Sequence, residues 1–173
     1  MKLYHFTALE YLRSILAEGI TTGDVPLGPR RHGNAVWLTR APEPNAQLWT
    51  NDGSHVLSDD ERRLHASIFG APVPRGSRVP DKRAVRLTVE VPEGDKLLTQ
   101  WLPYARLRGA KTKWFRALES SPDWYIYRGT IPPAWLVAVA PLSAEARGML
   151  TPDGPPAADE AEERGDTQTE SES

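Results

Sequence analysis

A short strand that runs directly into a helix near the start of the chain limits the folds available to it. The aromatic and aliphatic run 3–7 favours a β-strand. Thr7 and Glu10 then have the spacing of a capping pair, and we expect Thr7 to cap the helix. Apolar residues follow at helical spacing until Gly19, a residue type that commonly ends helices. The chain is therefore expected to combine strands and helices, with His5 near the end of a strand.

Other stretches predict further strands and helices. The clearest strand is 85–91, where apolar residues alternate with polar ones, as in a strand with one buried face. The stretch 21–34 holds three glycines and two prolines, which favour a surface loop. The apolar piece 97–104 is interrupted by Pro103. We expect strands at 35–39, 84–91, 123–128 and 135–140, short helices at 59–68 and 113–120, and a loop at 69–80.

The length and composition favour one folded domain followed by a tail. A chain of 173 residues accommodates one domain of about 150 residues. After Met149 the sequence consists of prolines, glycines, acids and small polar residues, which bury too little apolar surface to fold. We predict a single α+β domain over 1–148, with two packed, mostly antiparallel sheets and flanking helices. A disordered acidic tail is expected at 149–173.

Residue types that are absent exclude several classes of site. The chain has no cysteine, which excludes disulfides, thiolate nucleophiles and cysteine-ligated zinc, and we expect no metal site. No apolar run reaches the eighteen or so residues that cross a bilayer. Charged residues interrupt the first twenty positions, unlike a secretory signal. We therefore expect a cytoplasmic protein without a membrane partner.

The small net charge of −2 conceals an uneven distribution. The segment 151–173 contains eight acids and one base, so residues 1–150 carry fifteen acids, twenty bases and a net charge of about +5. Several of these bases are grouped, for example Arg30 with Arg31 and Arg62 with Arg63. A basic domain suits a phosphate-bearing ligand, although grouped arginines are also compatible with an ordinary solvated surface.

Two aromatic-rich strands leave the role of their central residue open. His5 near a strand end is placed to bond a hydroxyl-rich ligand, or to be satisfied by the backbone of a neighbouring strand. Trp37, in the expected strand 35–39, either lines a cleft or packs in the core, because five residues do not show which face is buried.

Three blocks in order, 3–7, 35–39 and 123–127, resemble the ADP-ribosyltransferase superfamily. In its histidine-type branch, which includes diphtheria-toxin-like and poly(ADP-ribose) polymerase-like enzymes, the first strand carries a histidine followed two positions later by Ser or Thr, like His5 and Thr7. Trp37 stands where the family has a tyrosine that stacks on nicotinamide, and Asp123 where it usually has a catalytic glutamate. The opening segment through Ile20 and the residue Arg40 are also similar to DNA-targeting toxins of the DarT type.

The resemblance implies an NAD-dependent transferase that moves ADP-ribose to a nucleic acid or protein acceptor, with NAD as its substrate. It also implies a site for each part of NAD. Asp123 and His5 are the expected catalytic residues, Glu119 is a second carboxylate near Asp123, and the expected NAD-binding residues are His5, Thr7, Arg13, Trp37, Thr39 and Arg40.

The chemistry of such a transfer calls for the same residue types. Cleaving the nicotinamide–ribose bond passes through an oxocarbenium-like sugar, which a carboxylate such as Asp123 stabilises. An aromatic face packs the nicotinamide, a neutral histidine bonds ribose hydroxyls, and an arginine meets the pyrophosphate. Two other hypotheses remain: a degenerate module of the same fold that binds a nucleotide or a partner without catalysis, and a basic nucleic-acid-binding domain whose aromatics stack bases.

Overall fold

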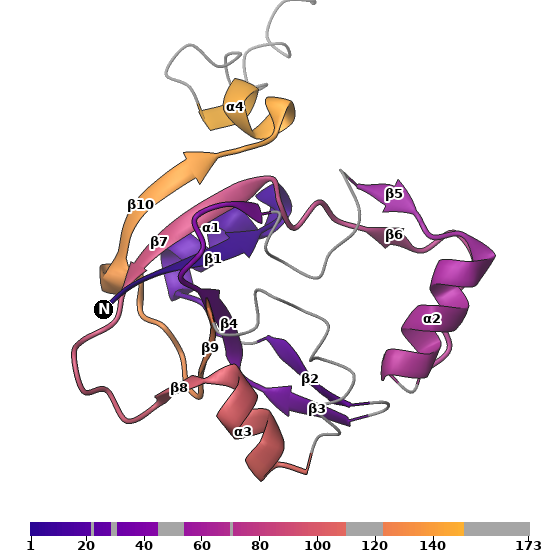
Figure 1. The fold of residues 1–173 in the computed structure, drawn as a ribbon. Coiled ribbons are helices and arrows are strands. Elements are labelled where there is room, and N and C mark those ends of the chain that lie inside the picture. Colours follow the sequence, from indigo (N-terminus) through magenta and orange to yellow (C-terminus); the bar gives the residue numbers. More distant parts are fainter. Residues whose placement is uncertain (22, 29–30, 45–53, 70, 110–122, 151–173) are drawn as a thin grey trace, which may run out of the picture.

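The computed structural model describes residues 1–21, 23–28, 31–44, 54–69, 71–109 and 123–150. Their fold is α+β, as expected, and is built around one six-stranded antiparallel sheet (Figure 1). The four strands predicted outside the opening run are confirmed, each end to within one residue. In spatial order the strands are β10 (Leu136–Pro141), β7 (Val85–Glu90), β1 (Lys2–Thr7), β4 (Val36–Thr39), β9 (Trp124–Tyr127) and β8 (Leu98–Gln100).

Strand β1 is central because it pairs on both sides. Along β7 the pairing covers the whole strand, from Lys2 opposite Glu90 to Thr7 opposite Val85. The alternation predicted for 85–91 places Val85, Leu87 and Val89 on one buried face. On its other side β1 pairs with β4, which pairs in turn with β9. The three blocks that carry the family resemblance therefore form three neighbouring strands.

Both faces of the sheet are covered. On the first face, α1 (Leu9–Glu18) buries Leu12 and Ile15 against residues of β1, β4, β7 and β9. On the second face, α3 (Trp101–Leu107) and the small sheet of β2 (Asp24–Gly28) and β3 (Arg31–Asn34) cover β4 and β9. Full burial of each large side chain contributes roughly 2 kcal/mol. The side chains that pack on this second face form a cluster in which Trp37 is half-buried and the others are buried: Val25, Ala35, Trp101, Ala105, Trp124 and Ile126.

The structure corrects several local predictions. The expected loop at 21–34 contains the β2–β3 hairpin. Of the two packed sheets that were predicted, one is the six-stranded sheet and the other is small, the two-stranded β2–β3 sheet; β5–β6 is a further two-stranded sheet in the described residues. Pro103 does not break the piece 97–104, because it lies in the first turn of α3, where a backbone N–H is not needed. Thr7 is the buried last residue of β1, and Ala8 holds the N-cap of α1 without a side-chain bond.

Towards the C-terminus the short 3-10 helix η4 (Pro133–Trp135) leads into β10, and α4 (Ala144–Leu150) follows β10. Helix α4 ends two residues beyond the predicted domain boundary at 148. The predicted helix at 113–120 and the tail from 151 lie outside the described residues. No helix in the described part of the chain is long and apolar enough to cross a membrane.

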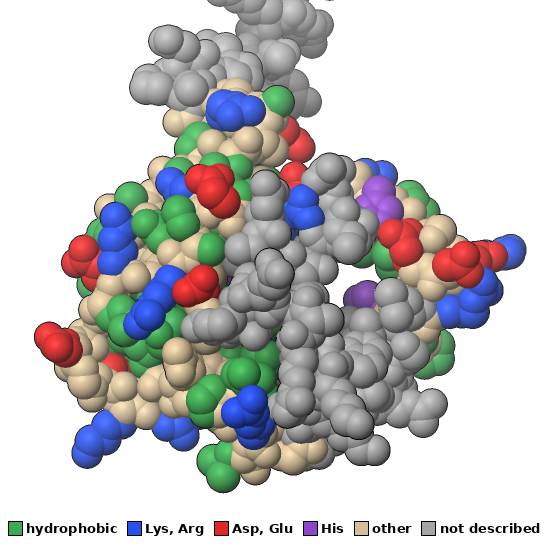
Figure 2. Space-filling view, viewed as in Figure 1, with side chains coloured by type: hydrophobic (Ala, Val, Ile, Leu, Met, Phe, Trp, Pro, Cys, Tyr) green, Lys and Arg blue, Asp and Glu red, His purple; other side chains and the backbone are tan. Residues whose placement is uncertain are grey.

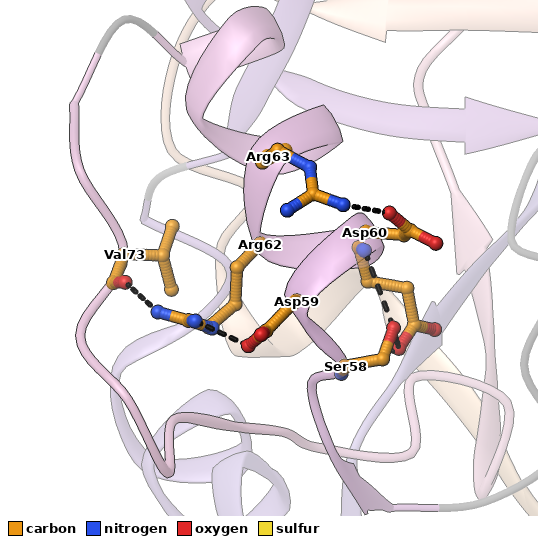
Figure 3. Close-up of polar contacts among 7 residues, drawn as sticks. Ser58, Asp59, Asp60, Arg62, Arg63 and Val73 are labelled. Atoms are coloured by element: carbon orange, nitrogen blue, oxygen red, sulfur yellow. Dashed lines mark hydrogen bonds and ion pairs between the residues drawn. The ribbon is translucent and has the colours of Figure 1, made fainter.

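An arm of β5 (His55–Val56), α2 (Asp59–Phe69) and β6 (Arg78–Val79) projects from the sheet (Figure 1). The predicted helix at 59–68 is confirmed. Ser58 and Glu61 form a capping box at its start, with the Ser58 backbone N–H donating to Glu61 over 2.9 Å. Figure 3 shows this box together with the pairs Arg62–Asp59 and Arg63–Asp60 and the bond from Arg62 to the Val73 carbonyl. In the space-filling view an opening lies beside the arm (Figure 2).

Candidate functional site

The imidazole of His5 is bound to the neighbouring strand. Its Nδ1 lies 2.9 Å from the carbonyl oxygen of Trp37. A carbonyl oxygen only accepts hydrogen bonds, so Nδ1 carries the proton in the neutral ring and Nε2 keeps a lone pair. Burial lowers the pKa of His5; the bond to Trp37 opposes this, and the positive charge of Lys82 adds to the lowering. The ring is therefore neutral at pH 7, with Nε2 as an acceptor.

This contact exists because β1 and β4 pair over a very short length. Their register consists of the single pair Tyr4–Thr39, although β1 pairs with β7 along its full length. Trp37 lies two residues before Thr39, so its carbonyl oxygen would accept a hydrogen bond from the β1 backbone if the pairing of β1 with β4 continued. The His5 ring bonds it instead. A side chain therefore occupies the position of a ladder bond in the centre of the sheet.

Asp123 and Arg40 lie opposite each other where β4 ends and β9 begins. The Arg40 backbone N–H donates to the Asp123 carbonyl over 2.9 Å, which extends the β4–β9 ladder by one pair. The Arg40 guanidinium carbon lies 5.0 Å from the centre of the Tyr125 ring, a cation–π contact. Within the described residues its N–H groups make no hydrogen bond, and Arg40 is exposed. A guanidinium held in this way is the group that binds anions such as phosphate most strongly.

His5, Arg40 and Asp123 project from the same face of the sheet. Residues directly opposite each other share a face, and neighbours along a strand alternate. Arg40 is opposite Asp123, and Tyr4 is opposite Thr39. His5 follows Tyr4 and Arg40 follows Thr39, so both lie on the face opposite to that pair. Three of the predicted site residues therefore share one face of three adjacent strands.

Trp37 lies on the other face. It alternates with Leu38 and so shares its face with Thr39, opposite Ile126 of β9. Its ring centre is 5.0 Å from that of Trp124 and 5.6 Å from that of Trp101, and these two are fully buried. Trp37 is thus largely a core tryptophan, the second of the two roles left open by the sequence. Its backbone carbonyl, and not its ring, is what contacts His5.

Of the remaining predicted NAD-binding residues, Thr7 shares the face of the three, whereas Thr39 and Arg13 do not join them. Thr39 is buried on the second face, and its hydroxyl accepts a bond from the Ala41 backbone over 3.1 Å. Thr7 lies two residues after His5 on β1, on the same face, and is buried there. Arg13 is exposed on α1, and no hydrogen bond or ion pair connects it to His5 or Asp123. Of the two arginines expected to meet a pyrophosphate, Arg40 is the one held next to Asp123.

Two further side chains, Tyr125 and Lys82, act on the residues of the site. Tyr125 supports the Arg40 guanidinium; its position two residues after Asp123 on a strand was the available signal, since such residues share a face. Lys82, whose charge acts on His5, gave no sequence signal. Glu119 lies outside the described residues. Within the described part of the chain no group of three acidic or histidine side chains is placed to hold a metal ion.

A surface hollow of about 510 Å³ lies elsewhere, at the start of β1 beside η4 and β10. Its lining includes Lys2, Glu90 and Trp135, and none of the predicted site residues. The candidate site is therefore defined by strand pairing and not by this hollow.

Comparison of the chain with protein-family models, with curated proteins and with solved structures found no match.

Proposed function

We propose that this chain is an NAD-dependent ADP-ribosyltransferase-like protein that transfers ADP-ribose to a nucleic acid or protein acceptor. The observation that supports it is the convergence of His5, Arg40 and Asp123, which are distant in sequence, on one face of β1, β4 and β9. These are the strands that carry the resemblance to that superfamily.

Each of the three residues has a part in the proposed reaction. The neutral His5 accepts a hydrogen bond from a ribose hydroxyl at Nε2. Arg40, backed by Tyr125, bonds the pyrophosphate with its guanidinium N–H groups. Asp123 stabilises the oxocarbenium-like ribose as the bond from its anomeric carbon to nicotinamide breaks and nicotinamide leaves with the electron pair. The acceptor then attacks that carbon and loses its proton to the carboxylate or to water.

The stacking role of Trp37 stays a prediction, and the register argues against it, because the Trp37 ring faces away from His5. In its place Tyr125 is the aromatic ring on the side of Asp123. The roles of Thr7, Thr39 and Arg13 also stay predictions, as do the cytoplasmic location and the toxin-like character.

Calorimetric titration with NAD and an assay of nicotinamide release test the proposal together. We expect Asp123→Asn to reduce turnover about 100-fold or more while sparing NAD binding, because the charge acts mainly in the transition state. Arg40→Gln should weaken NAD binding roughly tenfold or more, and Arg13→Gln should not. Asp60→Asn, the same change on the exposed surface of α2, is the matched control.

A second candidate, a nucleotide-binding module of the same fold without catalysis, is favoured by one observation: the family's stacking position is occupied by Trp37, which packs with Trp101 and Trp124. NAD binding without nicotinamide release, unaffected by Asp123→Asn, would select this candidate. Absence of NAD binding, with salt-dependent binding to DNA or RNA, would instead select a basic nucleic-acid-binding domain.

A further inference from the structure

Arg86 of β7 holds the segment that follows β4, although another strand lies between the two. Its Nη1 donates a hydrogen bond to the carbonyl oxygen of Pro42 over 2.7 Å. In the sheet, β1 separates β7 from β4. The Arg86 side chain crosses that strand, and its guanidinium carbon lies 5.2 Å from the centre of the Tyr4 ring, a cation–π contact. Arg86 and Tyr4 share the second face of the sheet, because Tyr4 is opposite Thr88, two residues from Arg86.

This bond lies where the sheet has little main-chain pairing. Strands β1 and β4 share the single pair Tyr4–Thr39, although β1 pairs with β7 along its full length. The end of β4 is therefore weakly attached to β1, and Arg86 adds a link to it from β7. A hydrogen bond from a charged guanidinium is roughly twice as strong as one between neutral groups. The side chain thus compensates for the missing ladder bonds.

The bond also fixes the backbone next to Arg40, because Pro42 is only two residues further along the chain. The Arg40 backbone N–H is bonded across to β9, and the Ala41 N–H donates to the Thr39 hydroxyl over 3.1 Å. The bond from Arg86 to the Pro42 carbonyl completes this set. Contacts at three successive residues therefore determine the course of the chain after β4, and with it the direction in which the Arg40 side chain leaves the backbone.

We propose that Arg86 is a positioning residue for the candidate site. By holding Pro42 it keeps the Arg40 guanidinium over the Tyr125 ring, 5.0 Å from its centre, on the side of Asp123. Arg86 itself lies on the second face and does not touch NAD. A side chain on one face of the sheet thereby controls a binding residue on the other face. The effect on NAD rests on the proposed function, whereas the effect on the Arg40 side chain does not.

The proton on Nε of Arg40 reports its position in NMR spectra without NAD. Next to the face of the Tyr125 ring, this proton should resonate upfield of the Nε protons of other arginines, and Arg40→Gln identifies its signal by removing it. In Arg86→Gln the shorter side chain no longer reaches Pro42, so the signal should return to the ordinary position. Arg86→Lys retains a charged donor and most of the reach, so most of the upfield shift should remain.

Two further variants complete this test. Arg128→Gln is the matched control, because Arg128 donates to the Lys96 carbonyl over 2.6 Å after β9, and its loss should leave the Arg40 signal unchanged. Tyr4→Leu removes the ring that Arg86 lies on and should move the signal in the same direction by less. Circular dichroism establishes which variants are folded. A wild-type signal without the upfield shift, or an unmoved signal in folded Arg86→Gln or Tyr4→Leu, would overturn the proposal.

Calorimetric titration with NAD shows whether Arg86 acts through Arg40. Arg86→Gln should weaken NAD binding about three- to tenfold, as for the loss of one hydrogen bond, and should change turnover at saturating NAD less. In a chain that already carries Arg40→Gln, adding Arg86→Gln should weaken binding no further. Equal weakening in both backgrounds would contradict the positioning role. A wild-type chain that does not bind NAD would refute the proposed function instead, and the Arg40 proton signal alone would then decide the positioning role.

Discussion

Gly19 offers the sharpest test of how the first helix is held on the sheet. It ends α1 with φ of 86°, a conformation that residues with a Cβ rarely adopt. A Cβ built on Gly19 would lie 2.2 Å from the backbone oxygen of Ile131 and 3.1 Å from its carbonyl carbon. Both atoms belong to the backbone, so no side-chain rotation relieves the contact. We therefore expect Gly19→Ala to displace the chain at this point.

The cost follows from the bonds at this contact. Ile20 and Ile131 exchange two backbone hydrogen bonds of 2.9 and 3.0 Å, which join the end of α1 to the segment after β9. Losing them costs about 1 kcal/mol each, and the positive φ adds about 1 kcal/mol. Gly19→Ala should therefore lower the free energy of unfolding by about 3 kcal/mol, or the melting temperature by roughly 6–12 °C.

Urea denaturation with linear extrapolation measures this difference, and other glycines separate its two causes. Gly94 also has a positive φ, 76°, but a Cβ there meets nothing within 4 Å, so Gly94→Ala should cost only about 1 kcal/mol. Gly148, inside α4, is equally open, and Gly148→Ala should stabilise by up to about 1 kcal/mol. If Gly19→Ala and Gly94→Ala destabilise equally, the contact with Ile131 does not constrain the fold as argued.

Three other predictions concern pH, the arm and the core. Burial lowers the pKa of His5 in the folded state, so the unfolded chain binds more protons and the free energy of unfolding should fall as the pH drops through about 6.5. The urea midpoints measured at pH 7.5 and at pH 5.5 should therefore differ less in His5→Gln than in the wild type. An equal difference in the two proteins would contradict this. Ser58→Ala removes the N-cap of α2 and should cost about 1 kcal/mol, seen as faster amide exchange confined to the arm; exchange unchanged there would show that the cap is dispensable. Trp101→Ala should lower the free energy of unfolding by about 3–5 kcal/mol, whereas Leu107→Ala on the same helix should be nearly neutral, and similar effects of the two would argue against the tryptophan cluster as a core.

The elements whose signal is local were predictable from the sequence. The alternation in 85–91 and the compact apolar runs at 3–7, 35–39 and 123–128 identified β7, β1, β4 and β9, because one-sided burial leaves a period-two pattern in a strand. Apolar spacing up to Gly19 likewise identified α1. Elements without such a pattern were missed. Strands β2 and β3 lie among glycines and prolines, which favoured a loop. Pro103 suggested a break in the chain, although the first turn of α3 tolerates a proline.

The candidate site was predictable in its residue types and less so in its arrangement. His5, Arg40 and Asp123 were named from short motifs, and the strand order β1-β4-β9 brings them to one face. Their roles stay predictions until NAD binding is measured. Only the tertiary structure placed the ring of Trp37 on the opposite face and Tyr125 beneath Arg40. Alternation along a strand divides its residues into two sets that lie on opposite faces. Which set packs against which part of the core depends on the cross-strand register and on how α3 and the β2–β3 hairpin cover the sheet. These contacts join distant segments of the chain, so they leave no periodic pattern in the sequence.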